Sequence, residues 1–413
     1  MGYFNQTLRG VSWIGVLRVV SRILVTGRLA ILARIFAPSE FGAFAIATLV
    51  LAFFEVVTET GINVYLVQEK KHISKYLNEA WLVSMIRGTV IGILIFLSAK
   101  PVSMFFNSPN AYTLILLTAV IPFIKGFINP SIVLFQKDLK FQSEFVFRSI
   151  ILLFESIAMV TIALVTKSVS SMIWGFIFSA LVEVILSFMY VRPWPRVSFK
   201  YATVKDIFTR GKWVTLFGIF AYLAKEGDNA VVGKIINSAA LGTYQMGYKI
   251  STLVITEITE VASKVTFPIF VRLCDDPRRL FAAYFKSTGV IIFATICIGI
   301  PLILFTKPIV LIALGDKWLA VVPVVKILTV YGIIRAISGY AATLFLAVQK
   351  QNYAAFMTIT RFFGLAIVVV PLTYRYGIIG TGYSALISVA VELPVVLYFL
   401  YKIFHDKQTL QKG

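Results

Sequence analysis

Arginine side chains interrupt the first apolar stretch of this sequence at helical spacing. Between residues 11 and 34, Arg18, Arg22 and Arg28 fall within a sector of roughly 120° on a helical projection. A charge at the centre of a bilayer costs about 2.5–3.5 kcal/mol, so these side chains should face a protein interior or water rather than lipid. Because arginine binds phosphate through paired donors, the three residues are candidates for binding an anion.

A longer polar stripe lies in residues 241–271. Lys249 and Lys264 share a sector of roughly 140° there with Glu260 and several neutral polar residues. A stripe of this length on an apolar helix predicts a water-filled cavity. Lys249 and Lys264 therefore join the three arginines as candidates for anion binding.

Carboxylates in the apolar stretches are candidates for binding a proton or a sodium ion. A carboxylate near cations in a partly dry cavity can gain or lose a proton, or bind sodium, as its exposure changes. The candidates are Glu55, Glu59, Asp228 and Glu260. Ion pairing within one helix, of Lys225 with Asp228 or of Glu260 with Lys264, is the structural alternative. Arg87 could likewise only extend toward the cytoplasmic interface.

Cations outnumber carboxylates inside the predicted spans by 14 to 9. Internal pairing cannot neutralise that surplus, which favours an anionic ligand. The sequence offers no catalytic set: its two cysteines and two histidines lack metal-ligand spacing, and no glycine-rich phosphate-binding loop occurs. We therefore expect that the protein is not an enzyme and has no cofactor or metal. Any energy that its function requires should come from an external gradient.

Composition places these charges in a membrane protein. The chain has 413 residues, 59% of them hydrophobic and 14% charged, and its mean hydropathy is +0.87. Soluble domains carry about 25% charged residues, so the chain is predicted to cross the bilayer repeatedly. The net charge of +20 does not indicate nucleic-acid binding, because that needs a soluble basic surface.

Twelve stretches are long and apolar enough to cross a bilayer, which takes about 20 residues. They are 11–34, 41–67, 77–98, 111–135, 145–166, 170–191, 212–235, 241–271, 284–305, 321–348, 354–374 and 379–401. The apolar stretch 308–314 is too short to cross. The predicted fold is an all-α polytopic membrane protein.

The distribution of loop cations predicts the orientation. With the N-terminus inside, cytoplasmic segments carry 20 lysines and arginines and outer loops carry five. Positive residues accumulate on the cytoplasmic side of membrane proteins. Both termini are therefore predicted to be cytoplasmic.

An internal repeat predicts two halves. Residues 33–44 (ARIFAPSEFGAF) match residues 233–244 (GKIINSAALGTY) at an offset of about 200 positions. An even number of spans per copy gives two parallel six-helix lobes around a central cavity, an architecture of transporters. The predicted domains are an N-lobe at 1–192, a cytoplasmic basic linker at 193–211, a C-lobe at 212–404 and a cytoplasmic tail at 405–413.

Three groups of motifs resemble one transporter family. The most specific lies between residues 228 and 277 and includes DNAVVGK, ALGTY, GYK and FPIFVRLCDDP. LAR through Pro38 near the N-terminus and YGIIGTG at 376–382 belong to the same pattern. Together they resemble the polysaccharide exporters, or Wzx-type flippases, of the multidrug/oligosaccharidyl-lipid/polysaccharide flippase superfamily. Lys234 departs from the pattern, since arginine is common there, and the departure removes a bidentate donor.

The resemblance implies a function in the inner, cytoplasmic membrane. Members of the family translocate an undecaprenyl-pyrophosphate-linked oligosaccharide to the outer leaflet for O-antigen, lipopolysaccharide or exopolysaccharide synthesis, alongside a polysaccharide polymerase and other assembly proteins. Alternating access of the two lobes is the expected mechanism. A lipid II flippase and a cation-coupled multidrug exporter of the same superfamily are the alternatives. An integral-membrane glycosyltransferase and a purely structural scaffold in a glycan-assembly complex are more distant ones.

Overall fold

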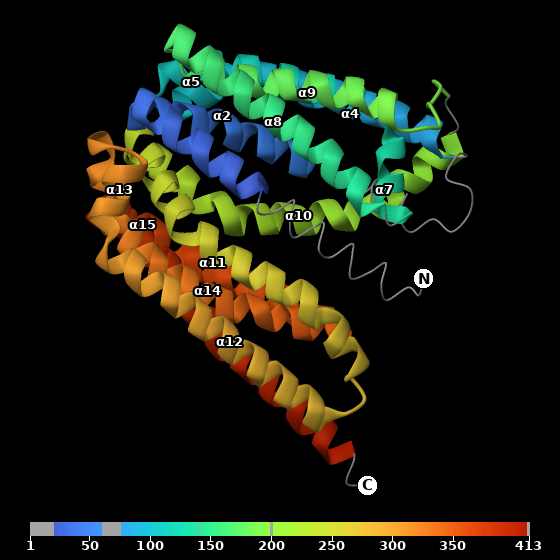
Figure 1. Cartoon of the computed structure of the whole chain (residues 1–413), viewed down its shortest axis with the longest axis vertical. Helices are drawn as coiled ribbons and strands as arrows, with labels where there is room; N and C mark the ends of the chain where they lie inside the picture. The colour runs from blue at the N-terminus through green and yellow to red at the C-terminus, as the bar shows by residue number, and fades with distance from the viewer. Residues whose placement is uncertain (1–19, 60–75, 139, 199–200, 411–413) are drawn as a thin grey trace. The chain divides into compact units, whose positions relative to one another are not determined.

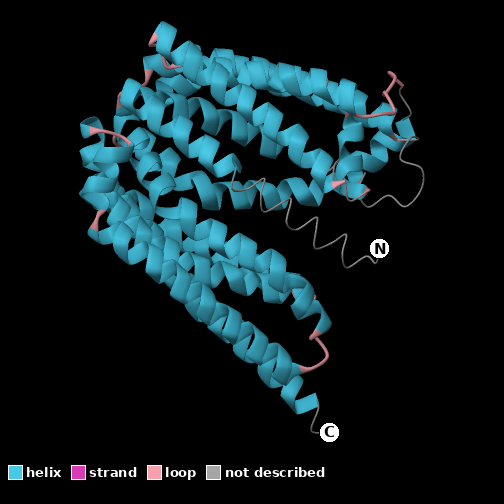
Figure 2. Ribbon diagram, viewed as in Figure 1, coloured by secondary structure: helices cyan, strands magenta, loops and turns pink. Residues whose placement is uncertain are grey.

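The computed structural model describes residues 20–59, 76–138, 140–198 and 201–410. Every regular element in these ranges is helical, and Figure 2 shows the described chain as helices joined by short loops. The all-α prediction is confirmed. Arg18 lies outside the described residues.

The chain divides into two compact units, Met1–Tyr222 and Leu223–Gly413, whose helices are labelled in Figure 1. Unit 1 begins with a helix over residues 20–35. It continues through α2 (Pro38–Val57), α4 (Leu77–Phe105), α5 (Pro109–Thr118), α6 (Val120–Lys125), η2 (Pro130–Val133), α7 (Leu134–Lys137), α8 (Phe141–Thr166), α9 (Ser170–Tyr190) and the first part of α10 (Tyr201–Ile235). Unit 2 contains the end of α10, α11 (Ser238–Arg272), α12 (Pro277–Leu304), α13 (Thr306–Ala313), η3 (Asp316–Val321), α14 (Val322–Ala347) and α15 (Gln351–Leu410). The division into lobes at 193–211 stays a prediction.

Seven described helices are long and apolar enough to cross a membrane. The predicted span 111–135 is divided into short helices, because prolines at 122 and 130 remove backbone donors there. The predicted spans 354–374 and 379–401 lie in α15, which bends between them at Gly377 (φ 61°, ψ −145°). That conformation is open essentially only to glycine. The short stretch near 308–314 forms α13, with eight residues.

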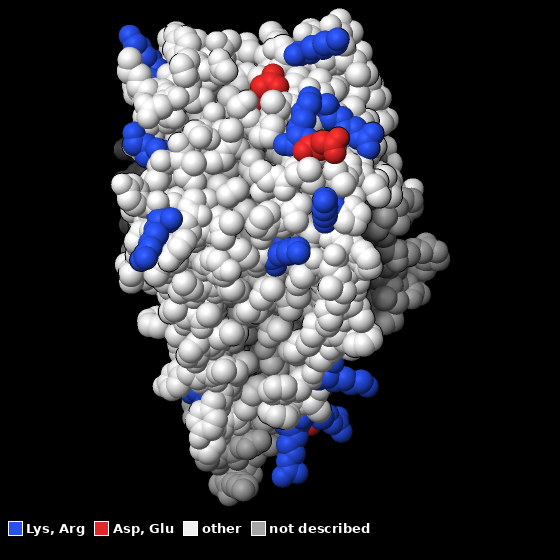
Figure 3. Space-filling model, turned by 90° about the vertical axis from the view of Figure 1, so that its left-hand side faces the viewer, with Lys and Arg blue, Asp and Glu red and all other residues white. Residues whose placement is uncertain are grey.

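The outer surfaces of these helices suit lipid. Large apolar side chains such as Phe96 on α4 and Phe293 on α12 are 61% and 72% exposed. The face drawn in Figure 3 is mostly uncharged, with scattered lysines and arginines. Apolar exposure on this scale is expected where lipid replaces water as the solvent.

A close contact between α4 and α6 in unit 1 positions two charged side chains. A Cβ at Gly88 on α4 would lie 2.3 Å from the carbonyl oxygen of Pro122 on α6. Only a glycine allows the two backbones to approach this closely. The contact places Arg87 and Lys125, which neighbour it in sequence, on the walls of one cavity.

Candidate functional site

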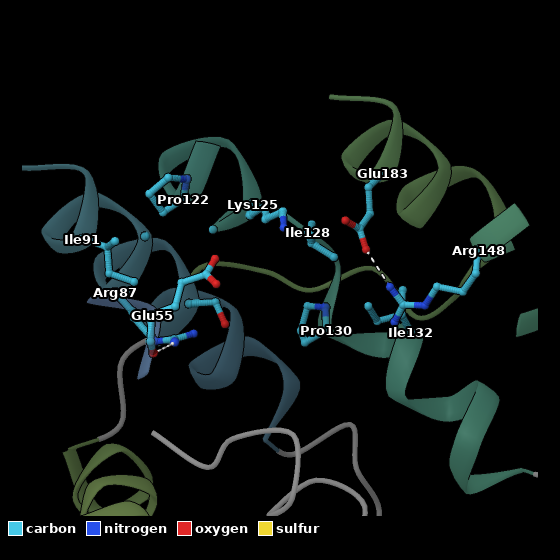
Figure 4. A pocket seen from close by; sticks show the side chains of 13 residues that line it. Glu55, Arg87, Ile91, Pro122, Lys125, Ile128, Pro130, Ile132, Arg148 and Glu183 are labelled. Atoms are coloured by element: carbon cyan, nitrogen blue, oxygen red, sulfur yellow. Dashed lines mark hydrogen bonds and ion pairs between the residues drawn. The ribbon is translucent and has the colours of Figure 1, made fainter. Parts of the chain in front are cut away.

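A cavity of about 330 Å³ lies within unit 1 (Figure 4). Its walls come from α2, α4, α6, η2, α8 and α9 and the segment between α6 and η2. Five of its lining residues are charged: Glu55, Arg87, Lys125, Arg148 and Glu183. A volume of this size is within the range of about 300–1,000 Å³ for small-ligand sites.

Arg87 holds the C-terminal end of α2. Its Nη2 donates to the carbonyl oxygen of Glu55 at 2.7 Å, and its Nε donates to that of Thr58 at 2.8 Å. Nη2 also lies 3.3 Å from the Glu59 carboxylate. The last carbonyls of a helix lack intrahelical donors and carry partial negative charge, which a guanidinium satisfies. Arg87 therefore caps the end of α2 in this structure. The alternative that it extends toward the cytoplasmic interface stays a prediction.

The opposite wall carries a second ion pair. Arg148 Nη1 on α8 lies 3.0 Å from Glu183 Oε1 on α9. The Glu183 side chain is 11% exposed and that of Arg148 is 45% exposed, so the guanidinium keeps donors facing open space. Between the two walls, Glu55 and Lys125 extend toward the cavity (Figure 4).

Of the predicted anion-binding arginines, Arg28 already has an acidic partner. Its Nη1 forms an ion pair with Oε1 of Glu155 on α8, and both side chains are about 15% exposed, at 15% and 14%. An anionic ligand at Arg28 has to compete with this carboxylate. Arg22 lies six residues, or about 1.7 turns, earlier on the same helix and is half-buried.

The carboxylate of Asp228 in unit 2 has a buried partner. The hydroxyl of Tyr244 on α11 donates to Asp228 Oδ2 at 2.7 Å, and both residues are buried. Lys225 instead pairs with Glu226, at 3.3 Å, so the Lys225–Asp228 alternative is wrong. The amide of Asn229 also donates to Glu226 Oε2, at 2.8 Å.

The remaining candidates lie along α11. Lys249, Glu260 and Lys264 are all exposed. The two lysines are 15 positions apart, or roughly 22 Å along the helix axis, so they cannot contact the same phosphate from one straight helix. They remain separate predicted contacts.

The partners of these charges could not be predicted from the sequence. Glu155, Glu183, Lys125 and Arg148 all lie within predicted spans, but none was assigned a role. Spacing within one helix carries no information on pairing between helices. The described residues contain no group of three or more His, Cys, Asp or Glu that could hold a metal ion.

The sequence is similar to a protein family and to individual proteins of polysaccharide biosynthesis. The family described as "Polysaccharide biosynthesis protein" matches residues 31–323. A membrane protein of the cps region of Klebsiella pneumoniae is 24% identical over 96% of this chain and 82% of its own length. The lipopolysaccharide biosynthesis protein WzxC of Escherichia coli K12 is 23% identical over 85% and 72%, respectively.

Solved structures show the same fold. A lipid II flippase MurJ in an inward closed conformation superposes with a TM-score of 0.80 at 16% identity, covering 95% of this chain and 89% of that one. An inward-facing multidrug resistance MATE family transporter of the MOP superfamily gives 0.68 at 15% identity, covering 95% of each chain. These likenesses confirm the predicted fold class.

Proposed function

The chain belongs to the polysaccharide biosynthesis protein family, and from this we propose that it translocates an undecaprenyl-pyrophosphate-linked oligosaccharide across the cytoplasmic membrane. The observation that carries the proposal is the family match over residues 31–323, together with a relative named for lipopolysaccharide biosynthesis. The fold itself is shared with lipid II and multidrug transporters, so it does not select among these substrates.

The basic residues support an anionic substrate. Arg18, Arg22, Arg28, Lys249 and Lys264 are the proposed contacts to the pyrophosphate and adjacent sugars. A multidrug exporter of cations would need an acid-rich interior, whereas cations exceed carboxylates in the spans of this chain. The substrate pyrophosphate would displace Glu155 from Arg28, so the pyrophosphate and the Glu155 carboxylate compete for the same guanidinium.

Alternating access of the predicted lobes would carry the substrate, while the polyprenyl tail stays in lipid. Glu55, Glu59, Asp228 and Glu260 are the proposed coupling carboxylates. The structure makes Glu59 and Asp228 the constrained members of this set, because they contact Arg87 and Tyr244. Transport assays with opposed proton and sodium gradients would identify the coupling ion.

A flipping assay in proteoliposomes tests the proposal. The assay follows a fluorescent undecaprenyl-pyrophosphate oligosaccharide, with lipid II as the competing substrate. We expect Arg22→Glu to slow flipping more than tenfold, because an added charge repels the pyrophosphate. The control is Lys100→Glu, which makes the same charge change at an exposed residue of α4. Equal rates for the two variants would remove Arg22 from the proposed site, and preferential flipping of lipid II would favour the alternative function.

A further inference from the structure

Two side chains of opposite charge, Glu55 and Lys125, line the unit 1 cavity. Within the described parts of the chain, neither the Glu55 carboxylate nor the Lys125 ammonium has a hydrogen-bond or ion-pair partner. The other three charged residues of the cavity have partners, since Arg87 caps α2 and Arg148 pairs with Glu183. A carboxylate and an ammonium that line one cavity are complementary to a ligand carrying both signs of charge.

The donors and acceptors of the cavity match a phosphodiester and an amine. Lys125 offers three N–H donors, and Arg148 keeps donors beyond the one used by Glu183. Both side chains therefore suit a singly charged phosphodiester. Glu55 has only acceptors when ionised and suits a primary ammonium. Figure 4 shows Glu55 and Lys125 on neighbouring walls, with Arg148 farther along the cavity.

The predicted orientation puts the cavity in the inner-leaflet half of the bilayer. Arg87, Arg148 and Glu183 lie 10, 7 and 7 residues from the ends of α4, α8 and α9 that the predicted orientation places inside. At 1.5 Å per residue, these positions are about 10–15 Å from the cytoplasmic helix ends. The hydrocarbon core of a bilayer is about 30 Å thick, so in the predicted orientation these positions lie within its inner-leaflet half, and a headgroup has to be drawn inward from the interface to reach them.

We propose that the unit 1 cavity binds the headgroup of a zwitterionic phosphoethanolamine lipid. The phosphodiester contacts Lys125 and Arg148, and the ammonium contacts Glu55. A glycerol headgroup of the same size offers no cation, so it leaves the Glu55 carboxylate uncompensated in a partly buried site. The site is separate from the proposed pyrophosphate contacts Arg22 and Arg28, neither of which lines this cavity, and it shares only Glu55 with the proposed coupling carboxylates.

Native mass spectrometry of the full-length protein in detergent tests this assignment. The probes are dioleoyl phosphatidylethanolamine, dioleoyl phosphatidylglycerol and soluble O-phosphoethanolamine, and the last distinguishes headgroup binding from binding of the acyl chains. We expect phosphatidylethanolamine to bind at least tenfold more tightly than phosphatidylglycerol. Lys125→Gln and Glu55→Gln should each weaken phosphatidylethanolamine binding about tenfold, the effect of losing one ion pair of about 1.4 kcal/mol. The matched control Lys100→Gln should leave it unchanged.

The variants make each outcome decisive. Equal binding of both lipids, or unchanged phosphatidylethanolamine binding in both cavity variants, would overturn the proposal. The proposal would also be overturned if Lys125→Gln weakened binding of phosphatidylglycerol while Glu55→Gln left phosphatidylethanolamine binding unchanged. That result would indicate a site for anions alone. Because binding is measured without transport, these results are independent of the flipping assay. Normal gel-filtration behaviour of each variant shows that it folds.

Discussion

The contact of Arg87 with the end of α2 gives the sharpest prediction. Replacing Arg87 with glutamine removes the charge and the two short bonds to the carbonyl oxygens of Glu55 and Thr58, at 2.7 and 2.8 Å. Hydrogen bonds from charged donors contribute about 1.5–3 kcal/mol each, which gives an upper range of about 3–6 kcal/mol. The Arg87 side chain is 27% exposed, so water replaces part of this contribution. We expect Arg87→Gln to destabilise the end of α2 by about 2–4 kcal/mol.

Hydrogen–deuterium exchange measures this local effect. A loss of about 2–4 kcal/mol raises the population of the frayed helix end by about 30- to 1,000-fold. Peptides covering residues 50–59 should exchange faster by that factor, whereas peptides from α12 in unit 2 should not change. Arg87→Lys should give an intermediate effect, because an ammonium keeps the charge but lacks the planar fork that reaches both carbonyls. Unchanged exchange of residues 50–59 in Arg87→Gln would refute the capping role.

Two further predictions concern unit 2. Gly377→Ala should destabilise the protein by about 1–3 kcal/mol, because alanine strongly disfavours φ 61° with ψ −145°. Thermal unfolding in detergent measures this loss of stability. A variant as stable as the wild type would show that α15 does not keep this bend. Tyr244→Phe should cost about 2–3 kcal/mol in the same assay, because it removes the hydroxyl that donates to the buried Asp228 carboxylate. The control Tyr222→Phe removes a bond to the neutral carbonyl of Leu49 and should cost about 1 kcal/mol, and a larger loss there would contradict the reasoning.

Local patterns alone predicted most of the helices. Apolar runs of about 20 residues locate α2, α4, α8, α9, α12 and α14, because a helix in lipid must satisfy its own backbone and present apolar side chains. The same reasoning did not predict the break in residues 111–135. Proline and glycine there weaken the helix, but whether a span breaks or merely bends depends on what packs against it.

The sequence also predicts the surplus of positive charge and the position of charged residues within the spans, because both depend only on composition and helical period. Only the tertiary structure decided which charges meet. Arg28 pairs with Glu155 across 127 positions, and Arg148 pairs with Glu183 across 35. Such pairing depends on how each helix is rotated and how closely its neighbours pack, as Gly88 shows for α4 and α6. Spacing along one helix places a charge on a face, and only packing between helices supplies its partner or leaves it facing a cavity.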